Sequence, residues 1–284
     1  MTTDASSRLC LNCGNELQGA FCHRCGQRDQ AKRLPLKALF HDVLHDIWHF
    51  DHKVLETLRL LVFKPGVLTL AYLEGRRSRY VPPFRLYIFV SFVLFFAFSL
   101  VPVGTGKPGA SSVNVIVESE TGKAEEKPTD TKASPEDEWA NNLKARAKAT
   151  KKNPEGFQRA FLSNLSKSLF LLMPLFAAIL HVLYLRRKPL YVDHLILSLH
   201  YHTLAFLVIL ALMGLAALPG EDWGLLPGLA LFLVPPIHLA ASLRRLHNQG
   251  WIKSLVKAAL TSVVYGAIIL ATLFGLLLLS LPKA

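Results

Sequence analysis

Four cysteines are the residues of this sequence whose type and spacing most directly indicate chemistry. They stand as Cys10-x2-Cys13 and Cys22-x2-Cys25, two pairs separated by eight residues, and a glycine follows each pair. Two such knuckles supply four thiolates, and the glycines allow tight turns in which backbone N–H groups point at sulfur, as tetrahedral zinc requires. The sequence therefore predicts a structural Zn²⁺ site in a ribbon over residues 1–30. Four sulfur ligands leave no open position for catalysis at this metal.

Other uses of paired cysteines fit the pattern less well. A c-type haem site needs histidine directly after the second cysteine, and Gly26 stands there. A redox dithiol needs only one pair, in a thioredoxin-like βαβ context. All four cysteines lie within the first 25 residues, so no disulfide can staple the bulk of the chain. Reduced cysteines place the ribbon in the cytoplasm.

Three histidines within apolar runs form a second candidate site. His181, His200 and His238 each lie a few residues from the same end of a predicted membrane span. Ionisable side chains at membrane depth usually face the interior of a helix bundle and mark function. We therefore predict a candidate intramembrane polar pocket, with Tyr184 and Tyr201 nearby, that binds a metal or an anionic headgroup. The alternative is that each histidine meets a headgroup or a backbone carbonyl separately.

A second group of histidines stands in an amphipathic segment that precedes the first apolar run. Apolar residues recur at helical spacing between Leu36 and Val62, and Lys64-Pro65-Gly66 ends the pattern. Asp51 interrupts the apolar face, so one helix and two helices both agree with the pattern. The opposite face carries histidines that suit either a polar outer face or a second metal site: His41, His45, His49 and His52.

The elements that must position these residues are membrane-spanning helices. Hydrophobic residues make up 51% of the 284 residues and charged residues only 18%, whereas a soluble domain carries more charge. Crossing a bilayer takes about 20 apolar residues. Five segments meet this length: Phe84–Val103, Ser168–Leu185, Leu195–Leu218, Trp223–Ser242 and Ser254–Leu281. The predicted fold is an all-α multi-pass membrane protein of about five transmembrane helices, with a small N-terminal zinc ribbon and an interfacial amphipathic helical segment.

This fold divides the chain into five regions. The zinc ribbon (1–30) is followed by cytoplasmic or interfacial amphipathic helices (31–83), the first transmembrane helix (84–103), an external region (104–167) and transmembrane helices 2–5 (168–284). In the external region Gly104–Thr131 is predicted to be a flexible linker, because it is rich in Gly, Ser, Thr, Lys and Glu. A helix is predicted from Ser134-Pro135-Glu136 to about Lys151, with serine as N-cap and proline at the first position.

Basic residues set the predicted orientation and the predicted partners. Short loops rich in Lys and Arg stay on the cytoplasmic side. The loops around Arg76, Arg186 and Arg244 all fall on one side if five spans are counted, so the N-terminus is predicted to be cytoplasmic and the C-terminus external. The formal net charge of +12 is spread beside the spans rather than gathered in one patch, which favours membrane lipids over nucleic acid. Three arginines beside Tyr80 are candidates for binding anionic headgroups: Arg76, Arg77 and Arg79.

Several short motifs, taken in order, resemble those of one bacterial family. They are Cys10-Leu-Asn-Cys13-Gly14, Phe21-Cys22-His-Arg-Cys25-Gly26-Gln27, Lys64-Pro65-Gly66, Tyr72-Leu73-Glu74-Gly75-Arg76-Arg77, Tyr80-Val81-Pro82-Pro83, Met173-Pro174-Leu175-Phe176-Ala177 and His194-Leu-Ile-Leu-Ser-Leu-His200. In this order and spacing they resemble the domain-of-unknown-function 3667 family of membrane proteins. The resemblance implies a zinc-ribbon protein of the bacterial inner (cytoplasmic) membrane, and it carries no established activity or substrate.

Three classes of function agree with these features. The first is a membrane scaffold or regulator whose zinc ribbon and basic cytoplasmic face bind a cytoplasmic protein partner or anionic lipid. The second is a transporter or lipid-translocating protein, because Pro174 and Pro235-Pro236 would break or bend two of the spans. The third is an intramembrane enzyme, for which the spans lack a cysteine nucleophile and paired carboxylates. The sequence favours the first class.

Overall fold

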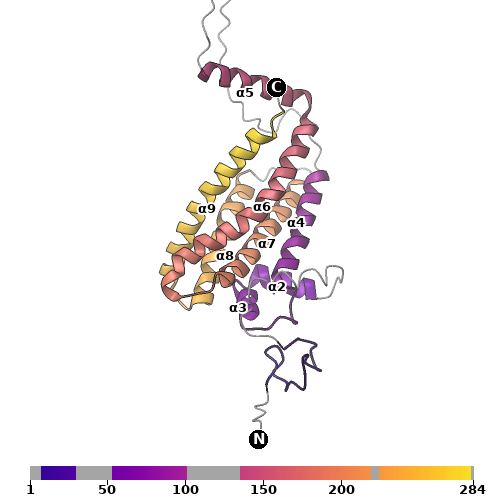
Figure 1. Ribbon diagram of the computed structural model, residues 1–284, viewed down its shortest axis with the longest axis vertical. Helices are drawn as coiled ribbons and strands as arrows, with labels where there is room; N and C mark the ends of the chain where they lie inside the picture. Colours follow the sequence, from indigo (N-terminus) through magenta and orange to yellow (C-terminus); the bar gives the residue numbers. More distant parts are fainter. Residues whose placement is uncertain (1–7, 30–52, 101–134, 219–223, 283–284) are drawn as a thin grey trace, which may run out of the picture. The chain divides into compact units, whose positions relative to one another are not determined.

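The computed structural model describes residues 8–29, 53–100, 135–218 and 224–282, and these residues are mainly helical (Figure 1). The helices are α2 (Lys53–Phe63), α3 (Val67–Leu73), α4 (Pro83–Leu100), α5 (Pro135–Lys152), α6 (Pro154–Tyr184), the 3-10 turn η1 (Leu185–Arg187), α7 (Tyr191–Ala216), α8 (Leu226–His247) and α9 (Trp251–Ser280). The predicted linker Gly104–Thr131 and the histidines at 41, 45, 49 and 52 lie outside the described residues.

Two compact units make up the chain. One combines Met1–Phe98 with Lys167–Thr272, and the other combines Ser99–Ser166 with Leu273–Ala284. The division falls inside α4, α6 and α9, so each of these helices contributes residues to both units.

Five described helices are long and apolar enough to cross a membrane, which confirms the predicted number of spans. They are Pro83–Leu100, Pro154–Arg187, Tyr191–Ala216, Leu226–His247 and Trp251–Ser280. The second begins at Pro154 rather than at the predicted Ser168, because the amphipathic piece continues into the apolar run as one helix. In this piece Phe157 and Phe161, one helical turn apart, stack with ring centroids 6.0 Å apart.

Large apolar side chains are exposed along the outer faces of these helices. Phe92 on α4, Leu171 on α6, Phe232 on α8 and Ile252 on α9 are all more than two-thirds exposed. Soluble proteins rarely expose apolar surface on this scale, whereas lipid-facing helices do so by necessity. The exposed faces therefore agree with helices that span a membrane.

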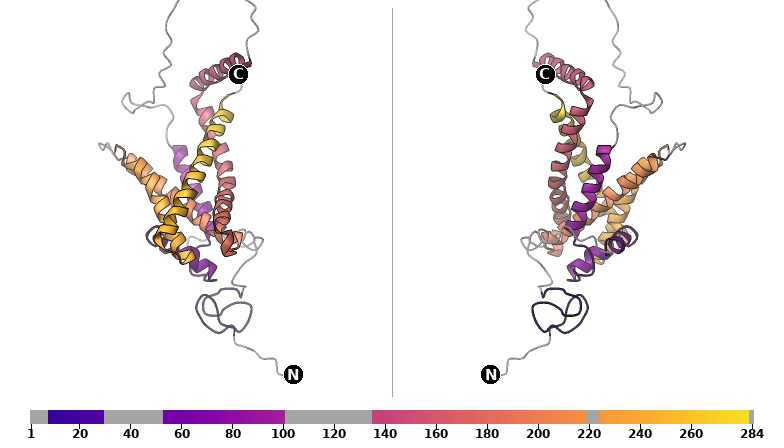
Figure 2. Two further views of the ribbon diagram at one scale, coloured as in Figure 1. Left: turned by 90° about the vertical axis from the view of Figure 1, so that its left-hand side faces the viewer. Right: turned by 90° about the vertical axis from the view of Figure 1, so that its right-hand side faces the viewer.

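Helix α7 is the centre of the first unit. In its most apolar stretch 61% of the residues are buried, against 11% in α9. One core cluster joins α7 to α3, α4 and α6, and a second joins α7 to α6, α8 and α9. Figure 2 shows α7 and α8 side by side in both views. Because α7 and α6 belong to both clusters, polar side chains on α7 face other helices rather than lipid.

Proline, aspartate and asparagine mark several helix ends. Pro83 and Pro154 occupy the first positions of α4 and α6, where a missing N–H costs nothing. Asp193 caps α7, since its carboxylate accepts from the backbone N–H of Leu190 at 3.1 Å. Helix α8 ends at His247 and is capped by Asn248, which adopts the left-handed conformation with φ 45°.

The prolines inside spans do not break their helices. Helix α6 continues through Pro174, and α8 continues through Pro235 and Pro236. Beside Pro174 the hydroxyl of Ser198 donates to the Met173 carbonyl at 2.7 Å, and that of Tyr191 donates to the Pro174 carbonyl at 2.8 Å. These two bonds tie α7 to α6 beside the proline.

The amphipathic segment ends as two short helices joined by a sharp turn. Helix α2 ends at Phe63, before the predicted stop at Lys64-Pro65-Gly66, and the seven-residue α3 follows. The sequence pattern did not indicate α3, because a helix this short has no detectable period. Inside α2 the buried Thr57 accepts from the backbone N–H of Val81 at 3.2 Å, which ties α2 to the start of α4.

The second unit contains the predicted external helix. Helix α5 begins at Pro135 and ends at Lys152, close to the predicted bounds. Its Arg146 donates to the carbonyls of Leu278, Leu281 and Pro282 at 3.0–3.1 Å. These are carbonyls at the C-terminal end of α9, so Arg146 satisfies groups that a helix end leaves unpaired.

Gly66 lies close to the backbone of α8, and its substitution tests this packing. Its φ is 75°, and a Cβ placed there would lie 3.0 Å from the Cα of Ser242 on α8. We expect Gly66→Ala to lower the free energy of unfolding by about 1–3 kcal/mol, through left-handed strain and overpacking. Thermal unfolding of the purified protein in detergent measures this change.

Gly214→Ala is the matched control for this experiment. Gly214 lies in α7 with open space where its Cβ would stand, and its φ is ordinary. The control should therefore match or slightly exceed the parent protein in stability. Equal unfolding temperatures for Gly66→Ala and the parent protein would contradict the close approach.

Candidate metal centre and buried histidines

The four cysteines lie in two knuckles that repeat each other at an interval of twelve residues. In the first knuckle Cys10 N–H donates to the Asn15 carbonyl and Gly14 N–H donates to the Cys10 carbonyl, both at 2.8 Å. In the second the same bonds join Cys22 to Gln27 and Gly26 to Cys22, again at 2.8 Å. Gly14 and Gly26 have φ values of 73° and 71°, the left-handed region that favours glycine. The glycines after each pair are thus required by the turns.

The sulfur atoms of the two knuckles converge. All four lie within 4.8 Å of one another, and Cys10 and Cys22 are buried. Sulfur ligands 2.3 Å from a tetrahedral ion stand about 3.8 Å apart, so this set matches the donor geometry of a four-thiolate metal site. The predicted grouping of Cys10, Cys13, Cys22 and Cys25 is therefore confirmed as a cluster that could hold a metal ion.

The surroundings of the cysteines shift their thiol pKa values in opposite directions. Burial raises the pKa of the Cys25 thiol, but hydrogen bonds from the Gln27 backbone and the Asn12 side chain help to lower it to about 6. The Asn15 backbone lowers the pKa of Cys13, yet desolvation and the neighbouring cysteine side chains raise it to about 12. Without a cation the Cys13 thiol therefore stays protonated near neutral pH. A bound cation would remove this conflict.

The ribbon is fastened to the segment that follows α3 through one side chain. Gln27 donates from its amide nitrogen to the Gly75 carbonyl at 2.8 Å. Its amide oxygen accepts from the backbone N–H groups of Arg77 and Ser78 at 3.0 and 3.1 Å. Leu11 of the first knuckle lies so close to Gly75 that a Cβ there would be 2.6 Å from its Cδ1. The ribbon and residues 75–78 therefore form one surface.

The predicted headgroup-binding arginines lie in this same segment. Arg76 forms an ion pair with Glu74, and Arg79 Nη2 lies 3.5 Å from a carboxylate oxygen of Glu56. The Arg77 guanidinium lies over an aromatic ring of α3, 5.3 Å from its centroid. Exposed ion pairs contribute about 0–1 kcal/mol, so they leave Arg76 and Arg79 able to bind another anion.

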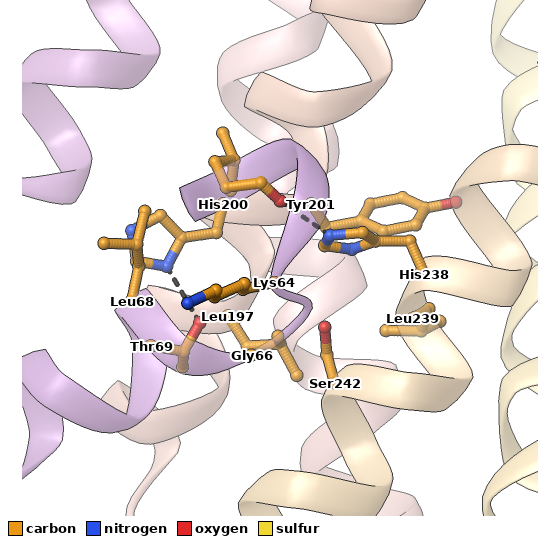
Figure 3. Close-up of a pocket in the computed structure, with 11 residues that line it drawn as sticks. Lys64, Gly66, Leu68, Thr69, Leu197, His200, Tyr201, His238, Leu239 and Ser242 are labelled. Atoms are coloured by element: carbon orange, nitrogen blue, oxygen red, sulfur yellow. Dashed lines mark hydrogen bonds between the residues drawn. The ribbon is translucent and has the colours of Figure 1, made fainter. Parts of the chain in front are cut away.

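Two of the three predicted intramembrane histidines line one small cavity (Figure 3). A hydrogen bond of 2.8 Å joins Nδ1 of the buried His200 to Thr69 Oγ1, and His238 Nε2 donates to the Leu61 carbonyl at 2.7 Å. The cavity measures about 10 Å³. This is roughly the space of one water molecule and far below that of a lipid headgroup. In the described structure both histidines therefore join α7 and α8 to residues 61–69.

His181 lies in a different group of side chains. Its ring centroid is 5.7 Å from that of His194, which in turn is 5.6 Å from that of His247. Tyr184 stacks on His247 at 3.8 Å, and Lys257 Nζ lies 3.5 Å from the centroid of the Tyr184 ring. The structure thus brings His200 and His238 together and places His181 with His194 and His247 instead.

A third polar network, centred on His202, crosses the bundle on the other side of α7. His202 Nδ1 donates to the Ser198 carbonyl at 2.8 Å, so Nε2 accepts from the Tyr265 hydroxyl at 2.6 Å. This links α7 to α9. Two residues along a helix point to nearly opposite sides, which is why His200 and His202 serve different partners.

The sequence reasoning missed His194 and His247. Both lie just outside the predicted spans, His194 directly before Leu195 and His247 five residues after Ser242. The elongated observed helices α7 and α8 carry them into the bundle. The nearness of both histidines to a span end was the feature of the sequence that could have identified them.

Fold and sites together define a helical protein with five potential membrane spans and a four-cysteine cluster. A comparison with family models matches residues 51–95 to the family described as Protein of unknown function (DUF3667). The match includes α2, α3 and most of α4, and it confirms the family predicted from the motifs. Comparisons with curated proteins and with solved structures give no match.

Metal analysis tests the cysteine cluster directly. We expect about one metal ion per purified chain, because four thiolates around one ion complete a tetrahedral site. The Cys22→Ser/Cys25→Ser variant should lose the metal and unfold the ribbon, while the spans stay inserted. His23→Ala is the matched control, since His23 stands inside the second knuckle and binds Asn15 at 2.9 Å rather than joining the cluster. Full metal content in the double-serine variant would contradict the site.

Proposed function

We propose that this protein is a scaffold or regulator of the bacterial inner membrane, with a zinc-bound ribbon held against a basic face on the cytoplasmic side. The observation that carries the proposal is the triple hydrogen bond of Gln27 to residues 75–78. A ribbon fastened in this way is part of a fixed surface. It is not a recognition domain on a flexible linker.

Zinc is the metal that suits the donor set best. Four thiolates in closed tetrahedral geometry select zinc or iron–sulfur chemistry over oxygen-preferring cations. The two-knuckle repeat, with a glycine after each cysteine pair, is typical of structural zinc ribbons. Zinc therefore serves folding here, and the ribbon's outer surface serves recognition.

The ribbon offers an apolar surface suited to a cytoplasmic protein partner. Leu9 and Phe21 occupy equivalent positions of the twelve-residue repeat, and they are 61% and 62% exposed. Exposed apolar side chains on a small rigid module are typical of protein docking sites. The adjacent Arg76, Arg77 and Arg79 would bind anionic headgroups at the same face.

The transporter alternative has less support from the described spans. It predicts helices broken at Pro174 and at Pro235-Pro236, yet α6 and α8 continue through these prolines. The cavity between α3, α7 and α8 admits about one water molecule. The scaffold or regulator is therefore the function that the geometry favours.

Site-specific photo-crosslinking in cells tests this proposal. A photoreactive amino acid at position 21 should give a discrete protein adduct, because the repeat exposes this side chain at the docking surface. The adduct should disappear in the Cys22→Ser/Cys25→Ser background, which lacks a folded ribbon. It should weaken several-fold with Gln27→Ala, since the ribbon loses its fixed orientation.

The matched control is Gln18→Ala, an exposed glutamine of the same ribbon. Its adduct should equal that of the parent protein. An adduct of equal yield in the double-serine background would refute the metal-dependent scaffold, as would the absence of any protein adduct.

A further inference from the structure

A second cavity lies where α8 ends and α9 begins. It measures about 350 Å³, and its lining includes Arg244, Arg245, Asn248, Gln249 and Trp251. Pockets for small ligands typically start at about 300 Å³, so this cavity can take a group the size of a lipid headgroup. It is separate from the ribbon and from the arginines that follow α3.

The charged side chains that line this cavity are all basic. Arg244 and Arg245 are both exposed and both line it, and no acidic side chain belongs to the described lining. The first turn of α9, which begins at Trp251, also lacks an acidic residue. A guanidinium offers a planar fork of N–H donors that matches the oxygens of a phosphate group. The cavity therefore suits an anion rather than a cation.

Both arginines are held in place by other parts of the protein. The Arg244 guanidinium carbon lies 4.6 Å from the ring centroid of Trp251, and Arg245 donates to the Pro65 carbonyl. A cation–π contact uses the face of one guanidinium, and the carbonyl uses one N–H of the other. Further N–H donors stay available on each. Donors fixed in advance lose less entropy when a ligand binds.

The lining beside the arginines is fixed as well. Gln249 is buried, and its side-chain nitrogen donates to the Tyr184 hydroxyl at 2.5 Å. Its backbone N–H donates to the Arg244 carbonyl at 3.2 Å, and Asn248 turns the chain in a left-handed conformation. The turn that holds the two arginines is thus anchored to α6 through Tyr184.

We propose that this cavity binds the phosphate group of an anionic lipid. A lipid headgroup and free phosphate would both offer a phosphate group that binds between the two guanidiniums. The lipid is the source because the cavity joins the ends of two potential spans, where headgroups gather. Trp251, 48% exposed beside the cavity, suits the same boundary, since indoles concentrate at membrane interfaces. The binding shares no residue with the proposed docking surface, and so it stands or fails separately.

Fluorescence quenching at Trp251 tests the site. Trp48, Trp139 and Trp223 are changed to Phe, which leaves Trp251 as the reporter. The protein is placed in phosphatidylcholine nanodiscs with an increasing fraction of phosphatidylglycerol brominated near the headgroup. Brominated phosphatidylcholine gives the reference. We expect phosphatidylglycerol to quench Trp251 at the lower mole fraction.

Two charge-matched variants separate the cavity from general attraction. Arg244→Gln/Arg245→Gln should reduce the preference for phosphatidylglycerol about tenfold, because the phosphate loses its donors. Arg186→Gln/Lys188→Gln removes the same charge from exposed positions after α6, and it should change the preference by less than about twofold. Arg244→Gln alone, which keeps the Arg245–Pro65 contact, should give an intermediate loss and guards against misfolding of the double variant.

Two results would overturn the proposal. Equal loss in both double variants would mean attraction by net charge without a site. Removal of the preference by added inorganic phosphate would assign the cavity to free phosphate instead of lipid. An undiminished preference with added phosphate, lost only in the Arg244 and Arg245 variants, supports the lipid site.

Discussion

Residues 61–69 are held by α7 and α8 at four points. These contacts determine where the ribbon and the basic residues Arg76, Arg77 and Arg79 lie. His238 binds the Leu61 carbonyl, Arg245 binds the Pro65 carbonyl, Gly66 packs against Ser242, and Thr69 binds His200. A seven-residue helix such as α3 has no stability of its own in water, so these contacts must supply it. Residues 75–78 come directly after α3 in the chain, and Gln27 fastens the ribbon to them. One docked segment thus links the cysteine cluster to the bundle.

The polar residues in the spans serve this arrangement because hydrocarbon offers them no other partner. A buried donor or acceptor left unpaired costs about 1–3 kcal/mol, so polar side chains in a bundle specify which helices meet. His202 with Tyr265 joins α7 to α9, and Ser198 with the Met173 carbonyl joins α7 to α6. The most buried span is thus paired with α3, α6 and α9, and these partners are arranged around it.

Local features of the sequence predicted much of this structure. The apolar runs indicated five spans, and Ser134-Pro135 indicated the start of α5. The cysteine spacing indicated the cluster, since two knuckles bring their sulfurs together through short-range turns alone. Depth in the membrane did not predict which histidines meet, because it leaves the rotation and the neighbours of each helix undetermined. His181 therefore lies with His194 and His247, and Gln27 found partners about fifty residues away that no local pattern encodes.

Hydrogen–deuterium exchange of α3 tests the docked segment most directly. The account predicts that the backbone amides of Leu70–Leu73 in the metal-loaded protein exchange slowly, within about tenfold of the amides of α7, because docking protects them. Protection should fall in a Thr69→Val/His238→Ala variant, in which two of the four contacts are lost, while α7 itself stays protected. Exchange of these amides at the rate of an exposed peptide in the parent protein, with α7 fully protected, would contradict the account.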